Sequence, residues 1–583
     1  MEFSELILIP KVDGVVLTER TNEKQPSLEG TLCLSGHTLL LSSRQDLKKE
    51  LWLLYRNIDT IEKKTNNQIP GGSIILKCKD FRILQLDIAS TDDLSNVVLS
   101  LEKLSSLDQS SQYPFFYRPQ SSNHNKHQDE DGWSAYTPVS EWSRLLAAHG
   151  DEWRISYLNR EYKICNSYPS TLIVPRLIDD QVIISSAAFR DGGRFPILCY
   201  RHEGGSILFR SGQPMCGATG RRCKEDERLL NIVLGAGRRG YIIDTRSANQ
   251  AQSARARGGG TEIDSAYPQW RKVFKSVPRL GELSESLCKL IDACNDTSCS
   301  TSQWLSRLEN SGWLTAVQSA LNAACVVAQC LHQELAAVLV HGGSGRDSTL
   351  IVTSLAQIIL NPDCRSVRGL QALLEREWIQ AGHPFFTRTR HGVYHNQSHT
   401  QHYAPTFLLF LDCLHQLHHQ FQFSFEYTTD MLRELFKHTY CSEYGTFLGD
   451  SEAERISLRL AQRTYSLWSH MNKPESLENW LNPLYEPNPS VIWPTVAPIS
   501  IRLWKELYLA HTSACSWNDF IPCVRQIKNN YCAVKKMANQ LRTQLRRALD
   551  EIASSSDTPC EPENEQEQML SNLSQLKFES QKI

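Results

Sequence analysis

Short apolar runs separated by turn residues dominate the chain from residue 6 to residue 86. The runs read GTLCL, HTLLL, ELWLLY, GSIILKC and FRILQL, with SGH, TNNQIPGG and KD among the turn signals between them. Runs of this length predict the strands of an antiparallel sheet or a small barrel. Apolar residues at 94, 97, 98, 101, 104 and 107 then recur at helical spacing, which predicts one amphipathic helix covering the open end of that barrel.

The stretch at 336–360 follows a different pattern. An apolar run meets a Gly-rich turn, and the pair Ser348 and Thr349 opens a long apolar segment in which Gln357 is the only strongly polar residue. This order predicts a buried strand, a tight loop and a buried helix. Backbone N–H groups of such a loop converge on the helix N-terminus, where aligned peptide dipoles favour an anion. The pattern therefore predicts a phosphate-binding cradle.

Around that stretch, strand-like and helix-like segments alternate. Strands are expected at 240–244 and 338–341, and helical stretches at 302–335 and 350–360. This alternation predicts an α/β domain with a central sheet.

Near the C-terminal end, apolar residues alternate in steps of three and four. They form a heptad seam of about four repeats, long enough for a coiled coil. The seam residues are Val524, Ile527, Tyr531, Val534, Ala538, Leu541, Leu545, Ala548 and Ile552. The alternative is a single amphipathic helix that packs on its own domain.

The residues beside the seam bear on its partner. The bases Lys528, Lys535 and Arg542 occupy successive e positions, whereas the g positions are mostly neutral. Neither a parallel nor an antiparallel homodimer would form the usual salt bridges between e and g positions. We therefore expect a different chain with acidic flanks as the partner, and a disordered acidic tail after the seam.

Composition narrows the class of protein. The chain has 583 residues, 41% of them hydrophobic and 22% charged, with a formal net charge of −2. It is long enough for several cores, and its charge gives no overall case for nucleic-acid binding. The start MEFSELILIP lacks the features of a secretory signal, and the apolar stretches are too short to span a bilayer. The 18 dispersed cysteines never form a C-x2-C pair, which favours reduced cytosolic thiols.

The side chains of the Gly-rich loop decide its chemistry. A phosphatase of the Cys-x5-Arg type needs a thiolate nucleophile at the strand end and an arginine that grips the phosphate oxygens. This loop has no cysteine at the strand end, and its arginine, Arg346, does not stand at the position that closes the loop. The candidate site residues are His341, Gly342, Gly343, Ser344, Gly345, Arg346, Asp347 and Ser348.

The loop nevertheless resembles that of the myotubularin family of phosphoinositide 3-phosphatases, whose active members read V-H-C-S-D-G-W-D-R-T. His341, Gly345, Asp347 and Thr349 match this motif. By the resemblance, the nucleophilic cysteine falls on Gly342, the general-acid aspartate on Ser344 and the phosphate-gripping arginine on Ser348. Further stretches, including WRISYLNREYKICNSYPSTLIVP and YGTFLGDSEAER, extend the resemblance from residue 3 to about residue 504.

The resemblance implies a fold class and domain boundaries. It implies an α/β domain with the Cys-x5-Arg phosphatase fold, a central sheet flanked by helices, preceded by a β-rich PH-GRAM domain and followed by a coiled-coil helix. The expected boundaries are 1–118 for the PH-GRAM domain, 119–132 for a flexible linker, 133–508 for an inactive phosphatase domain, 517–553 for the coiled coil and 554–583 for the disordered acidic tail.

The resemblance also implies a function. We expect a catalytically inactive member, a regulatory subunit that forms heteromers with active myotubularins through the coiled coil. It would change their activity, stability and location on membranes in endosomal trafficking. We expect a cytoplasmic protein with peripheral association to intracellular membranes, no cofactor and no nucleic-acid partner.

Two alternatives concern the loop itself. One is a phosphoinositide-binding module that uses the Gly-rich loop without catalysis, with Arg346, Arg221 and Arg222 as candidate headgroup ligands. The other is an esterase, because His341-Gly342-Gly343 resembles an oxyanion loop, but no G-x-S-x-G elbow follows.

Two groups of histidines raise the question of a metal. Those at 391, 395, 399 and 402 have near-helical spacing, and those at 415, 418 and 419 lie on a further helix face. No cysteine or carboxylate completes either set in the sequence, so we expect no metal site.

Overall fold

The computed structural model describes residues 3–19, 28–43, 50–64, 70–106, 132–146, 152–234, 238–296, 298–395, 403–511, 530 and 533–548. The chain divides into two compact units, Met1–Ala514 and Cys515–Ile583. The predicted tail at 554–583, and all but the last residue of the predicted linker at 119–132, lie outside the described residues.

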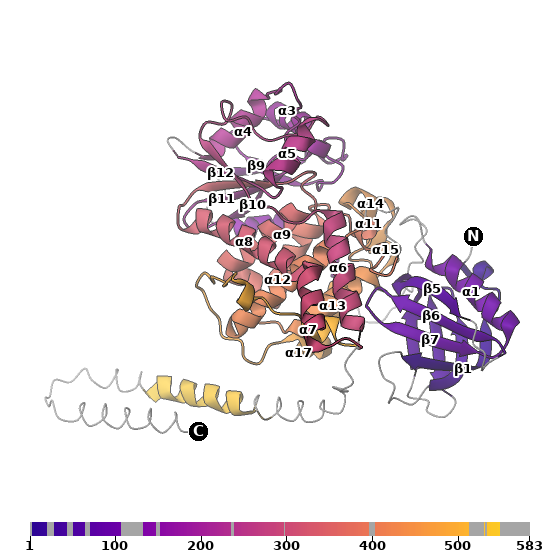
Figure 1. Cartoon of the computed structure of the whole chain (residues 1–583). Helices are drawn as coiled ribbons and strands as arrows, with labels where there is room; N and C mark the ends of the chain where they lie inside the picture. The colour runs from indigo at the N-terminus through magenta and orange to yellow at the C-terminus, as the bar shows by residue number, and fades with distance from the viewer. Residues whose placement is uncertain are drawn as a thin grey trace, which may run out of the picture. The chain divides into compact units, whose positions relative to one another are not determined.

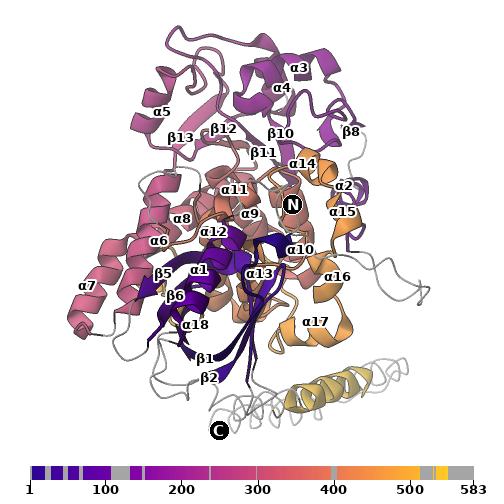
Figure 2. The same ribbon diagram turned by 90° about the vertical axis from the view of Figure 1, so that its right-hand side faces the viewer.

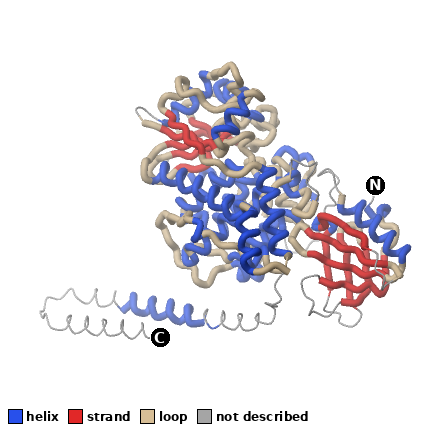
Figure 3. The backbone as a smooth tube through the Cα atoms, in the orientation of Figure 1, coloured by secondary structure: helices blue, strands red, loops and turns tan. Residues whose placement is uncertain are grey.

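A seven-stranded antiparallel sheet forms the N-terminal domain, with the strand order β4-β3-β2-β1-β7-β6-β5. Alternate residues of its strands are buried, as in β3, so that one face of the sheet lines a core. Figure 3 shows this sheet in red, and Figure 1 labels helix α1 beside it. The strands are β1 (Lys11–Glu19), β2 (Leu28–Leu34), β3 (Thr38–Ser43), β4 (Glu50–Leu54), β5 (Ile58–Lys64), β6 (Gly72–Cys78) and β7 (Ile83–Ile88).

Helix α1 (Thr91–Ser105) closes this core as the periodicity predicted. The side chain of Ser90 caps its N-terminus by accepting a hydrogen bond from the backbone N–H of Asp93. Leu94, Val97 and Leu101 of the helix are fully buried against the sheet. The β-rich domain and its closing helix are thus confirmed.

A second sheet lies at the centre of the following domain, with the order β10-β11-β14-β12-β13. Its last four strands are parallel and β10 is antiparallel. Its strands are β10 (Ile197–Arg201), β11 (Ile207–Ser211), β12 (Gly240–Asp244), β13 (Trp270–Phe274) and β14 (Ala337–His341), and β8 (Trp153–Ser156) pairs with β9 (Leu172–Pro175) nearby in sequence.

Helices cover both faces of this central sheet. Figures 1 and 2 show α3, α4 and α5 on one side of it and α8 and α9 on the other. Accordingly Val338 and Val340 of β14 join the core that contains α8 and α9, whereas Leu339 joins the core that contains Leu230 of α4. Every residue of β14 is buried, which explains its uninterrupted apolar sequence and confirms the α/β prediction.

The remaining helices complete the domain. They are α2 (Pro138–Leu145), α3 (Asp180–Phe189), α4 (Lys224–Leu234), α5 (Ala248–Arg255), α6 (Leu280–Asn295), α7 (Thr301–Ser311), α8 (Trp313–His332), α9 (Ser348–Leu360), α10 (Val367–Leu374), α11 (Phe385–Thr389), α12 (Thr406–Gln420), α13 (Thr429–Tyr440), α14 (Glu452–Ser457), α15 (Leu460–Arg463), α16 (Leu467–Met471), α17 (Pro474–Trp480) and α18 (Lys505–Tyr508).

The helical stretch predicted at 302–335 is in fact two helices, α7 and α8. Gly312 separates them with a φ of 73°, a left-handed conformation that ends α7. Among the described helices, α8 alone is long and apolar enough to cross a bilayer. It lies in the main core, where Val317, Leu321 and Val327 are fully buried, which accounts for its composition.

The turn between β6 and β7 carries the basic residues Lys79 and Arg82, a pattern typical of a solvated strand edge, but the turn is largely covered. Lys79 is 4% exposed and its Nζ donates to the carbonyl oxygen of Arg390, 2.6 Å away. Beside it, Phe81 stacks on Phe436 with ring centroids 5.3 Å apart. Distant parts of the sequence therefore cover this turn, which the local charge pattern did not reveal.

The C-terminal unit contains a helix at 533–548. Of the predicted seam residues, Val534, Ala538, Leu541, Leu545 and Ala548 lie in it, and Val524, Ile527, Tyr531 and Ile552 lie outside the described residues. Four large apolar side chains of this helix, those of Val534, Met537, Leu541 and Leu545, are 58–64% exposed.

Candidate functional site

The Gly-rich loop joins the end of β14 to the start of α9, as predicted. It lies at the carboxyl edge of the parallel strands, where sheets of this kind place their ligand sites. Gly345 has a φ of 71°, and a Cβ there would lie 2.2 Å from the carbonyl oxygen of Ser211. Only glycine fits this position without a shift of the backbone.

A buried chain of charges holds the inner side of the loop. The Nε2 of His341 lies 3.0 Å from Oε2 of Glu262, whose Oε1 lies 2.6 Å from Nη1 of Arg190. Arg190 in turn pairs with Asp226 through Nη2 and Oδ2 at 2.5 Å. All four side chains are at most 1% exposed. Buried charges are tolerated in proteins when they are paired in this way.

These pairings set the protonation of the loop histidine. Burial disfavours the charged imidazolium, but the neighbouring Glu262 and Asp244 outweigh burial and raise the pKa of His341. Burial likewise disfavours the Glu262 carboxylate, but His341 and Arg190 outweigh it and hold the pKa of Glu262 well below its usual value. Both shifts favour the ionic form of the pair.

The outer side of the loop is tied to α11 and the residues around it. Arg388 grips Asp347 with two hydrogen bonds, from Nε and Nη2 to the two carboxylate oxygens, each 2.8 Å long. Arg346 donates from Nε to the carbonyl oxygen of Gly382 at 2.7 Å and from Nη2 to that of Asp450 at 2.9 Å. The guanidinium of Arg346 is thus engaged by backbone carbonyl groups.

A pocket of about 690 Å³ opens above the loop. Its described lining contains no cysteine, and its charged residues are Arg246, Arg257, Arg279, Glu282 and Asp347.

Two of these arginines have acidic partners within the protein. Arg246 pairs with Asp244, and Arg279 pairs with Glu282, each at 2.7 Å. Among the described residues, no side chain pairs with Arg257, and no acceptor is found for the backbone N–H groups from Gly343 to Arg346. The pocket thus offers several unused donors to an anion.

Comparison with known proteins identifies the family. Residues 112–456 match the model of the myotubularin-like phosphatase domain, and residues 11–105 match that of the MTMR6-9 GRAM domain. The chain belongs to the myotubularin family. The resemblance inferred from the loop motif is thereby confirmed, and so are the PH-GRAM and phosphatase parts of the predicted fold class.

Relatives within the myotubularin family extend this result. The chain is 51% identical over 521 residues to "Myotubularin-related protein 9" of Homo sapiens, covering 89% of this chain and 93% of that protein, and the Bos taurus protein gives the same figures. It is 34% identical over 488 residues to "Phosphatidylinositol-3-phosphate phosphatase MTMR7" of Homo sapiens, covering 82% of this chain and 72% of that protein.

Gly342, Ser344 and Ser348 are three of the positions that depart from the myotubularin motif, and the two serines line the pocket. Gly342 directly follows β14, and a Cβ there would lie 2.5 Å from Oγ1 of Thr245. That Thr245 oxygen lies 2.7 Å from Oγ of Ser348, so the two hydroxyl groups share a hydrogen bond. Ser344 is exposed to the pocket. Within the described residues, neither serine contacts a histidine or carboxylate that would act as a base.

The other predicted ligands lie elsewhere. Arg221 and Arg222 are exposed in the turn before α4, and Nη2 of Arg222 pairs with Oε2 of Glu227 at 2.9 Å. Neither these two nor Arg346 is among the residues that line the pocket. Sequence reasoning missed Arg257 and Arg246 instead. The signal for Arg257 was its place directly before three consecutive glycines, an arrangement that lets a backbone approach a ligand closely.

Proposed function

We propose that this chain is a pseudophosphatase, a regulatory subunit that forms heteromers with active myotubularins and modulates their activity, stability and membrane location. The observation that carries the proposal is Gly342. It stands at the end of β14, where the family motif has the nucleophilic cysteine, and it has no side chain. Removing the nucleophile of a catalytic unit costs on the order of a millionfold in turnover.

The two other substituted positions support the same conclusion. Ser348 cannot replace a guanidinium as a bidentate phosphate ligand, and its hydroxyl is already bonded to Thr245. The hydroxyl of Ser344 is a far weaker acid than a carboxylic acid, so it cannot replace the aspartate as a general acid at neutral pH. All three groups that a Cys-x5-Arg phosphatase uses are therefore replaced in one loop.

The helix at 533–548 supports the second half of the proposal. Its seam residues Val534, Leu541 and Leu545 are exposed, and Lys535 and Arg542 occupy the e positions beside that seam. A partner helix with acidic residues at the facing positions would cover the seam and pair with these bases. The MTMR7 phosphatase, a relative by sequence, represents the candidate class of partner, because its name describes the phosphatidylinositol-3-phosphate phosphatase activity that this chain would regulate.

One experiment tests both halves. The purified full chain, an active myotubularin, and their mixture are assayed for phosphate release from phosphatidylinositol 3-phosphate. We expect no release by the chain alone and an altered rate in the mixture. Release by the native chain that is abolished by Ser344→Ala or Ser348→Ala would overturn the assignment as a pseudophosphatase. An unaltered rate in a mixture that does not co-purify would overturn the regulatory role.

A second candidate function is capture of a phosphoinositide headgroup without turnover. It is favoured by the free guanidinium of Arg257 beside the unused backbone donors of the loop. Co-sedimentation with vesicles containing phosphatidylinositol 3-phosphate tests it. Arg257→Glu is expected to abolish binding, whereas Arg221→Glu, an exposed arginine outside the pocket, serves as the matched control. Equal binding by both variants would exclude the pocket.

A further inference from the structure

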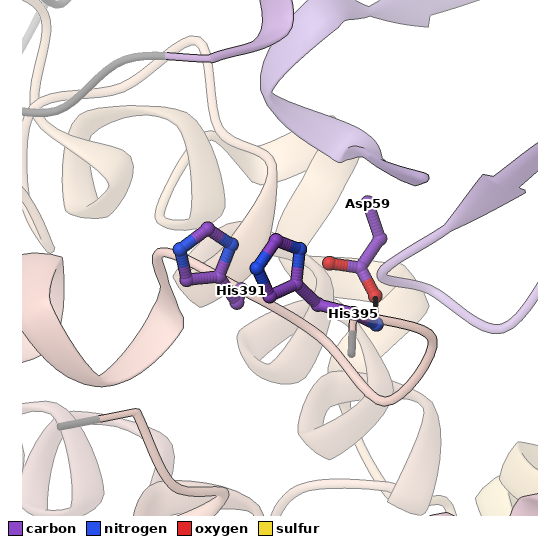
Figure 4. A group of neighbouring side chains, drawn as sticks. All are labelled: Asp59, His391 and His395. Atoms are coloured by element: carbon purple, nitrogen blue, oxygen red, sulfur yellow. Dashed lines mark hydrogen bonds between the residues drawn. The ribbon is translucent and has the colours of Figure 1, made fainter. Parts of the chain in front are cut away.

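A cluster of two histidines and one aspartate lies outside the lining of the pocket above the Gly-rich loop (Figure 4). The ligand atoms of Asp59, His391 and His395 all lie within 4.8 Å of one another. Asp59 belongs to β5 of the PH-GRAM domain, whereas both histidines follow α11 of the phosphatase domain. The structure thus supplies the carboxylate that the sequence did not place near these histidines.

The carboxylate of Asp59 is held in place by backbone groups. Its Oδ1 accepts the N–H of Gly392 at 2.7 Å, and its Oδ2 accepts those of Tyr394 and His395 at 2.8 and 3.1 Å. Three such bonds fix the orientation of the carboxylate and leave part of its acceptor capacity unused. They also hold the loop that carries both histidines against β5.

The two imidazoles are available as ligands. Within the described residues, no hydrogen bond reaches a ring nitrogen of His391 or His395. Both side chains are half-buried, so each keeps part of its surface open to solvent and to an ion that arrives from it.

From this arrangement we propose that Asp59, His391 and His395 form a binding site for a divalent transition-metal ion of the zinc class that joins the PH-GRAM and phosphatase domains. Two imidazole nitrogens and one carboxylate oxygen are a ligand set that Zn²⁺ accepts, with water in the fourth position. Zinc is favoured over calcium or magnesium because those ions prefer oxygen ligands throughout.

Two features limit the affinity. The rings stack with centroids 3.8 Å apart and planes 18° apart, so one ring must turn before both nitrogens face a single ion. Lys79 and Arg390 lie near His391 and oppose an incoming cation. We therefore expect weaker binding than at a closed structural zinc site with four protein ligands.

Zinc binding to the untagged full chain tests the proposal. The chain is stripped with a chelator and dialysed against ZnCl2, and bound zinc and the melting temperature are measured. The comparison is between the native chain, the double variant His391→Gln/His395→Gln and the control His419→Gln, a histidine of α12 outside the cluster. We expect the native chain and the control to bind one more equivalent of zinc than the double variant. Zinc should raise their melting temperature by about 2 °C or more.

A second measurement identifies the ligands on the native chain. Co²⁺ in place of Zn²⁺ should give visible absorption of a low-symmetry site without the near-ultraviolet band of a thiolate ligand. This readout does not depend on how well the double variant folds. Equal zinc in the native chain and the double variant, or a thiolate band that accounts for all bound Co²⁺, would overturn the proposal.

Discussion

The Gly-rich loop and the helix at 533–548 use their side chains in opposite ways. In the loop, His341 pairs with Glu262, Arg346 with two carbonyl groups and Asp347 with Arg388. In the helix, four large apolar side chains are more than half exposed. A segment whose side chains are satisfied inside the protein maintains a fold, whereas one with a row of exposed apolar residues offers a surface to a partner.

The largest effect is expected from the charges beneath the loop. Arg190→Met leaves the buried carboxylates of Asp226 and Glu262 without their shared cation. Breaking a buried pair in this way costs about 3–5 kcal/mol, so the melting temperature should fall sharply. Arg222→Met, which removes an exposed pair with Glu227, should change it little. Equal melting temperatures for the two variants would show that the buried network does not support the loop.

Substitutions in the helix at 533–548 should change partner binding but not the stability of the chain. Leu541→Asp/Leu545→Asp places two charges on the seam, and at about 1.5 kcal/mol or more for each lost apolar contact it should weaken partner binding at least a hundredfold. Because both leucines are exposed in this chain, its own melting temperature should not fall. Gln540→Asp/Thr543→Asp, on the outer face of the same helix, is the control for co-purification. Loss of partner binding in both double variants would show that the seam residues are not specifically required for binding.

Substitution of two glycines of the loop by alanine tests whether the loop has a fixed backbone conformation. Gly345→Ala combines a positive φ with a clash against Ser211, and it should cost about 1–3 kcal/mol. Gly343→Ala has no atom within 4 Å of the new Cβ and should be nearly neutral. Thermal melts of the two variants provide the measurement. A stable Gly345→Ala variant would mean that the loop has no fixed conformation to preserve.

The smallest effect is a dependence on pH. The pKa of His341 is raised above its ordinary 6.5 in the folded protein. The stability from its ion pair with Glu262 is therefore fully present below about pH 6.5 and is lost as pH rises through the raised value. Between pH 6 and pH 9 the melting temperature of the native chain should fall more than that of His341→Gln. Parallel profiles would show that His341 is not charged in the fold.

Apolar patterns were sufficient to predict the strand, loop and helix around His341, because all of β14 and most of α9 are buried on every side. They did not predict β5, because its sequence IDTIEKK contains four charged residues among few apolar ones. They also predicted one helix where Gly312 divides the apolar pattern into two.

The side chains that bond the loop residues could not be predicted from the sequence, for a different reason. Glu262 and Arg388 lie on other elements, and only the tertiary fold brings them to His341 and Asp347. Arg257 reaches the pocket, and Asp59 reaches His391, in the same way. Spacing along a chain cannot reveal contacts of this kind.

Under the heteromer proposed above, the exposed apolar residues at 533–548 have a consequence for the abundance of the protein in cells. Exposed rows of large apolar side chains are what chaperones and proteases of the quality-control machinery recognise. In a copy of the chain made in excess of its partner, these apolar side chains would stay exposed. Its steady-state level would then follow the supply of the partner more closely than the rate of its own synthesis.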